Sequence, residues 1–189
     1  MDHLISIAIG IGLAAACGFR VFVPFLVLSL AALGGHLPLA RGFEWVGTVP
    51  ALIAFATATG LEVLAYKIPW LDHALDALAT PAAVVAGVIA SASVMTDLPP
   101  LLRWSVALIA GGGAAGVVQG ATVLMRLKST LLTGGVANPV FATVELALAI
   151  VTSFFALVLP LLGLLILAGI CGFIFSRSRR FLFGRRGAP

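Results

Sequence analysis

Long apolar runs, separated by short polar or proline-containing breaks, occupy most of this chain and predict helices that cross a membrane. Thr80-Pro81 and Asn138-Pro139 each have the pattern of an N-cap residue followed by proline at the first helical position. The runs from Pro81 and Leu161 are short for a span, which needs about 20 residues. The pattern predicts an all-α, polytopic membrane protein of six transmembrane helices: Leu4–Leu33, Val49–Tyr66, Pro81–Met95, Leu101–Met125, Pro139–Leu159 and Leu161–Phe175.

The first of these runs contains an arginine between a glycine and a proline. Arg20 follows Gly18 and precedes Pro24, and the residues around them are apolar. Arginine at the centre of a bilayer costs about 2.5–3.5 kcal/mol on insertion scales, so it requires a partner or a polar cavity. Pro24 also lacks the amide that would bond to the carbonyl of Arg20 in a helix. We therefore expect a broken first helix, with Gly18 and Pro24 at the break.

Composition excludes a soluble domain. Of the 189 residues, 61% are hydrophobic and 10% are charged, which leaves too few polar groups to cover a surface in water. Met1-Asp2-His3 lacks the basic residues of a cleaved signal sequence. Cys17 and Cys171 both fall in apolar runs, so we expect buried thiols and neither a disulfide nor a metal site. The sequence divides into a transmembrane domain, 1–176, and a basic tail, 177–189.

The basic residues predict an orientation for six spans. The side that would hold both termini carries most of them, and only Arg41 and Arg103 fall opposite. This bias predicts that both termini lie in the cytoplasm. The basic residues on the cytoplasmic side are Lys67, Arg126, Lys128, Arg177, Arg179, Arg180, Arg185 and Arg186. On the same side, Trp70–Leu78 has the pattern of a short amphipathic surface helix, whose Asp72, His73 and Asp76 are too few to define a cation site.

Small residues recur every fourth position in the first and fourth predicted spans. Such faces allow another helix backbone to approach closely, so we expect them to pack helices. If the chain is two units of three spans, 1–97 and 98–176, the odd number of spans would make them inverted repeats, a plan common among transporters. The alternative is that both faces serve packing in an unrelated six-helix bundle. The residues of the two faces are Gly10, Ala14 and Gly18 in the first, and Gly112, Gly116 and Gly120 in the second.

Buried charge supplies the candidate functional residues. Glu145 is the first choice of partner for Arg20 and Glu62 is the second, since both fall between Arg20 and the predicted cytoplasmic side. In the functional interpretation Arg20 binds an anionic group near midplane, because a guanidinium binds phosphate or carboxylate through two parallel hydrogen bonds. A glutamate and Gln119 would then gate the site. In the structural interpretation a permanent Arg20–Glu pair holds the spans together.

Five strings along the chain are unusual enough to be specific: Gly18–Pro24, Glu62–Asp72, Asp97–Trp104, Gly111–Gly120 and Thr133–Pro139. They resemble the strings of a known family. It is a family of small bacterial inner-membrane proteins described only as a domain of unknown function, and the resemblance covers nearly the whole chain. The resemblance implies six membrane helices and says nothing about chemistry.

The sequence favours a small transporter or translocase for an anionic solute or lipid headgroup bound near Arg20. A proton or cation pathway through Glu62 and Glu145 is the first alternative, and a non-transporting scaffold or partner subunit is the second. An enzyme is not expected, because no hydrolase, zinc or phosphate-loop motif is present, and no cofactor or metal is predicted. The expected partners are membrane lipids, with anionic lipid at the basic tail, and a homo-oligomer is compatible with the sequence; nucleic acid is not expected.

Overall fold

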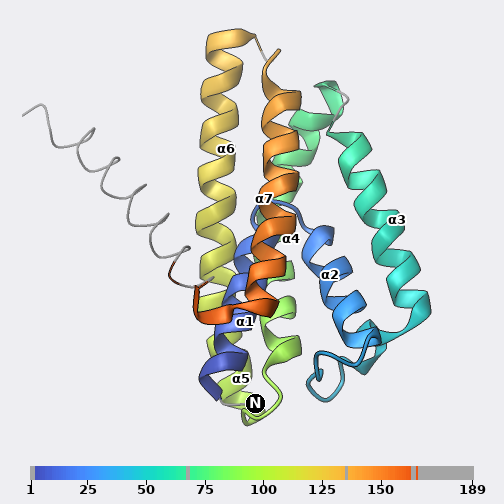
Figure 1. Cartoon of the computed structure of the whole chain (residues 1–189). Helices are drawn as coiled ribbons and strands as arrows, with labels where there is room; N and C mark the ends of the chain where they lie inside the picture. Colours follow the sequence, from blue (N-terminus) through green and yellow to red (C-terminus); the bar gives the residue numbers. More distant parts are fainter. Residues whose placement is uncertain (1–2, 67–68, 135, 163–164, 166–189) are drawn as a thin grey trace, which may run out of the picture.

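The computed structural model describes residues 3–66, 69–134, 136–162 and 165, and the regular structure in this part of the chain is entirely helical (Figure 1). Two helical stretches, Pro100–Thr133 and Asn138–Val158, are long and apolar enough to cross a membrane, and the other apolar helices are shorter. The elements in order are α1 (His3–Cys17), α2 (Phe22–Leu33), the short 3₁₀ helix η1 (Glu44–Gly47), α3 (Val49–Ala65), α4 (Pro69–Val94), α5 (Pro100–Val106), the π-helical segment η2 (Ala107–Gly112), α6 (Gly113–Thr133) and α7 (Asn138–Val158).

α1 and α2 form a helical hairpin. A methyl group added at Gly10 would lie 2.8 Å from the hydroxyl of Ser91 near the end of α4, so the first half of α1 lies there. The amide of Ala40, beyond α2, donates to the carbonyl of Ser93 at 2.7 Å, so the chain has returned to the same end of α4. Arg20, which lies between Gly10 and Ala40 in the chain, contacts the first part of α7 through its side chain. Figure 1 shows the same path, with α1 leading away from the end marked N and α2 returning toward it.

The predicted break in the first helix is confirmed, because α1 ends at Cys17 and α2 begins at Phe22. The prediction of a single first span, Leu4–Leu33, is wrong, because a break permits the chain to reverse as readily as to continue. Pro24 lies in the first turn of α2, where an amide has no partner within the helix in any case. The reversal places the start of α1 at the opposite end of the bundle from the C-terminal end of α6 (Figure 1), not on the same side as predicted.

The predicted start of the third span, at Pro81, is also wrong. The sequence predicts a surface helix at Trp70–Leu78 and a new helix from Pro81, whereas α4 is continuous from Pro69 to Val94. Pro81 interrupts only its own hydrogen bond, and the neighbouring turns maintain the helix. The side chains of residues 69–77 lie outside the described part of the structure, as do most of the sixth predicted span, Leu161–Phe175, and the tail, 177–189.

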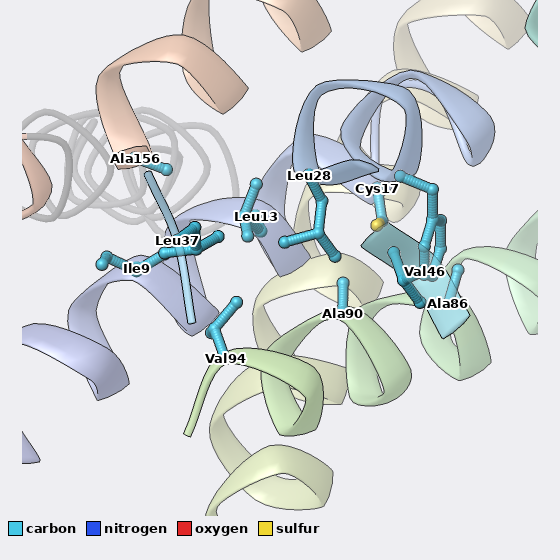
Figure 2. Close-up of a cluster of buried hydrophobic side chains, with 11 residues drawn as sticks. Ile9, Leu13, Cys17, Leu28, Leu37, Val46, Ala86, Ala90, Val94 and Ala156 are labelled. Atoms are coloured by element: carbon cyan, nitrogen blue, oxygen red, sulfur yellow. The ribbon is translucent and has the colours of Figure 1, made fainter. Parts of the chain in front are cut away.

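The core lies where α1 packs between α4, α6 and α7. Nearly all of α1 from Ala8 to Cys17 is buried. Figure 2 shows Ile9 and Leu13 of α1 with Leu28 of α2 and Val94 of α4 in one apolar cluster. Small side chains allow these helices to approach closely. Because α1 packs against α4, α6 and α7, it is the central helix around which the others are arranged.

The predicted packing faces are only partly used. Gly10 and Ala14 are buried against α4, and a methyl group on Gly112 would lie 3.0 Å from Val88. For Gly116 the corresponding distance, to Val84, is an ordinary 3.4 Å. Gly120 differs from the prediction, since a methyl group there would meet no atom within 4 Å.

The first and fourth predicted spans follow different paths. The first reverses at residues 18–21, whereas α5, η2 and α6 continue through 34 residues without a break. The π-helical turn of η2 places Gly111 where a methyl group would lie 2.7 Å from Ser91 Cβ, so the widened turn fits closely against α4. The fold therefore gives the predicted inverted repeat no support.

Candidate functional site

The hairpin of α1 and α2 carries Arg20 into the interior of the bundle. The side chain is 2% exposed, and its Nη2 donates a hydrogen bond of 2.9 Å to the carbonyl oxygen of Ala142 in α7. The same Nη2 lies 3.6 Å from Oε2 of Glu145, one turn further along α7. The first-choice partner from the sequence is thus close to Arg20, at the distance of an ion pair and not of a strong hydrogen bond.

A second arginine holds Glu145 more tightly. Arg126 of α6 donates from Nε to Oε1 of Glu145 at 2.9 Å, and its Nη2 also contacts Oε2. This is the bidentate arrangement in which a guanidinium binds a carboxylate most strongly. Arg126 and Glu145 are 4% and 6% exposed, so the pair lies inside the bundle. Arg20 and Arg126 therefore share one carboxylate.

Tyr66 lies against both guanidinium groups. Its ring centroid is 3.8 Å from Cζ of Arg20 and 4.4 Å from Cζ of Arg126. The negative face of an aromatic ring attracts a cation at such distances, and the attraction increases when water is excluded. Tyr66 is the residue at the C-terminal end of α3. It therefore connects α3 to the two arginines on α6 and on the hairpin.

Glu62 stabilises the break itself. Its Oε1 accepts a hydrogen bond of 2.8 Å from the amide of Val21, and its Oε2 accepts one of 3.1 Å from the amide of Phe22. These amides are at the beginning of α2, where they have no partner within the helix and where the helix dipole favours a negative charge. The second-choice partner of Arg20 thus supports Arg20 indirectly, because it fixes the backbone on which Arg20 lies.

The residues that the sequence interpretation missed are Arg126 and Tyr66. The apolar run ends at Met125, which predicts a cytoplasmic loop at Arg126, but α6 continues to Thr133. The signal that could have identified it is helical spacing, since the buried polar residues of α6 are separated by three or four positions and so share one face. These residues are Gln119, Thr122, Arg126 and Ser129.

Gln119 is buried on that face but does not reach the arginine cluster through a hydrogen bond. Its neighbour Val118 lies against Gly18, where a methyl group would approach the Val118 Cβ to 2.6 Å. In the described part of the chain no hydrogen bond joins Gln119 to Arg20. Gln119 is therefore a buried residue next to the packing contact of Val118, and the predicted gating role has no hydrogen bond to support it.

The hydrogen-bonding capacity of Arg20 is only partly used. Its Nε and Nη1 are buried and have no hydrogen-bond partner among the described residues. A buried donor without a partner costs about 1–3 kcal/mol, and more on a charged group, so these two nitrogens are candidate donors to a ligand or to water. Among the described residues no group of three or more His, Cys, Asp or Glu side chains is arranged to hold a metal ion.

Tyr66 and Glu62 also form part of the wall of a cavity of about 410 Å³. Its volume is within the range of about 300–1,000 Å³ that is typical of small-molecule sites. The rest of its wall is apolar. The lining residues come from the break, from the second half of α3 and from the middle of α4: Val21, Phe22, Ala58, Leu61, Glu62, Ala65, Tyr66, Leu78, Ala79 and Ala82.

In the described part of the chain these features define a helical protein with two helices long and apolar enough to cross a membrane and a buried cluster of Arg20, Arg126 and Glu145. Residues 7–180 match the model of a family described as a domain of unknown function, DUF4126, and the chain belongs to this family. The resemblance of the sequence strings to a family described only as a domain of unknown function is thereby confirmed. No curated protein and no solved structure matches the chain.

Proposed function

We propose that this protein is a small membrane transporter or translocase that binds an anionic group at Arg20. One observation carries the proposal. Arg20 is buried, and two of its three nitrogens have no hydrogen-bond partner in the described part of the chain. A guanidinium in this state can bind a carboxylate or phosphate through two parallel hydrogen bonds. Arg126 supports the same site, because it neutralises Glu145 and so reduces the repulsion of an incoming anion.

The apolar exterior supports the membrane location. Large hydrophobic side chains are exposed on the outer faces of the helices, among them Leu108, Ile109 and Leu132, which are 62%, 77% and 85% exposed. Such surfaces are rare on a protein in water and are expected where lipid covers the helices. The reversal of the first helix supports transport as well, since interrupted helices are a common way to place a binding site within a membrane.

The alternative of a proton or cation pathway has less support. Both oxygens of Glu145 contact Arg126, and both oxygens of Glu62 accept backbone amides. A carboxylate whose two oxygens already have hydrogen-bond partners is poorly placed to bind and release a passing cation. The scaffold alternative depends mainly on the basic tail, residues 177–189, which lies outside the described residues.

The test is phosphate and acetate binding by the purified protein, followed by anion flux in proteoliposomes. Arg20→Lys keeps the charge but loses the planar fork, so we expect affinity to fall about tenfold to a hundredfold, corresponding to about 1.5–3 kcal/mol for charge-assisted hydrogen bonds. Arg41→Lys is the matched control, because Arg41 is exposed. Equal binding by the two variants and the unmodified protein would show that Arg20 is only a structural cation.

A further inference from the structure

The cavity beside Tyr66 is lined in part by side chains that are exposed on the outer surface of the bundle. Leu61 of α3 and Leu78 of α4 belong to its lining and are 63% and 68% exposed. Apart from Glu62 and Tyr66, its lining residues are aliphatic or aromatic. A cavity with these walls accommodates a hydrocarbon chain and offers little to a small hydrated ion.

The same cavity ends at the arginine cluster. Tyr66 forms part of its wall, and the ring of Tyr66 lies 3.8 Å from Cζ of Arg20. The tyrosine therefore separates an apolar space from a cation with two buried donors that have no partner among the described residues. A ligand matching both sides would have a hydrocarbon tail and one anionic headgroup.

Glu62 also lies on the cavity wall and would repel an anion if its charge were free. Its two oxygens, however, accept the amides of Val21 and Phe22 at the positive end of α2. The carboxylate is thus directed toward the backbone of the break. Tyr66 remains as the group between the cavity and Arg20.

Resting on the function proposed above, we infer that the substrate is a single-chain amphiphilic anion, whose tail occupies the cavity between α3 and α4. Its carboxylate or phosphate headgroup binds Arg20 after the ring of Tyr66 turns aside. The chemistry required is noncovalent: the headgroup accepts hydrogen bonds from Nε and Nη1 of Arg20, and the tail replaces lipid against the apolar wall.

The test uses laurate carrying a photoreactive diazirine on its chain, with the full-length protein in lipid nanodiscs. Labelled peptides are identified by mass spectrometry. We expect labelling in the segments around Ala58 and Ala79, competition by unlabelled laurate and dodecyl phosphate, and weak competition by lauryl alcohol. Ala58→Phe fills the cavity and should abolish labelling. Ala54→Phe is the control, since Ala54 is exposed on the same helix and is not part of the lining.

The outcomes separate this inference from the proposed function. Labelling that is lost in Ala58→Phe and weakened in Arg20→Lys supports both. If phosphate and acetate bind in an Arg20-dependent manner but laurate does not label the cavity, the amphiphile is excluded and the anion site remains. If lauryl alcohol competes as well as laurate, the cavity holds only bulk lipid chains and the inference is overturned. Absence of both anion binding and labelling would overturn both proposals.

Discussion

Arg126 binds Glu145 through both oxygens of the carboxylate, with a hydrogen bond of 2.9 Å from Nε to Oε1 and a second contact from Nη2 to Oε2. Arg20 reaches the same carboxylate only at 3.6 Å. Glu145 is therefore chiefly the partner of Arg126, and Arg20 keeps donors for another acceptor. Under the proposed function, this division of roles makes Arg20 the binding arginine and Arg126 the structural one.

The Arg126–Glu145 pair should be strongly coupled in stability. Arg126→Met leaves Glu145 with Arg20 as its remaining cation, and breaking a buried pair in this way costs about 3–5 kcal/mol. Arg126→Met/Glu145→Met should cost less than the sum of the single variants, because it leaves no uncompensated carboxylate. Thermal unfolding in detergent measures the cycle, with Arg41→Met as an exposed control. Additive losses would show that the two residues act independently.

Removal of Glu62 should destabilise the hairpin. Glu62→Ala leaves the amides of Val21 and Phe22 without their acceptor, and the loss of a helix cap costs about 0.5–2 kcal/mol. Glu44→Ala is the matched control, since Glu44 also accepts a backbone amide, that of Gly42, but is exposed. Its effect should stay within about 0.5 kcal/mol. Equal effects in thermal unfolding would contradict the role of Glu62 at the break.

The sequence predicted this cluster only in part, for physical reasons. Glycine, arginine and proline within an apolar run located the break, because each is costly inside a membrane helix. They could not indicate whether the chain continues or reverses, since that depends on contacts with α4 and α7 that are distant in sequence. Arg126 was missed because hydropathy ends the run at Met125, whereas helical spacing from Gln119 would have continued it. Tyr66 gave no signal beyond its place at the end of a span.

Close packing at the break should make Gly18 intolerant of a methyl group. The added Cβ of Gly18→Ala would lie 2.6 Å from the carbonyl oxygen of Ala115, and overpacking of this kind costs about 1–3 kcal/mol. Gly120→Ala is the control, because no atom lies within 4 Å and alanine favours a helix by up to about 1 kcal/mol. Thermal unfolding should therefore shift in opposite directions. A neutral Gly18→Ala would mean that α1 and α6 are less closely packed than described.

The reversal at residues 18–21 has a direct test in the accessibility of introduced cysteines. Single cysteines at His3, His36 and Lys128, all exposed positions, are placed in a background of Cys17→Ala and Cys171→Ser. Because α1 and α2 form a hairpin, His3→Cys and His36→Cys should react with a membrane-impermeant maleimide from one side of the membrane. Lys128→Cys should react from the other side.

The hairpin and a single first span differ at only one of these positions. Residues 36 and 128 lie on opposite sides in both arrangements, so they serve as internal controls for the intactness of the vesicles. A first span that crossed the membrane would place His3→Cys on the side of Lys128→Cys, as the six-span pattern predicts. Labelling of His3→Cys together with Lys128→Cys would therefore exclude the hairpin, and with it the position of Arg20 at its tip. Labelling together with His36→Cys would establish that the first apolar segment enters and leaves from the same side.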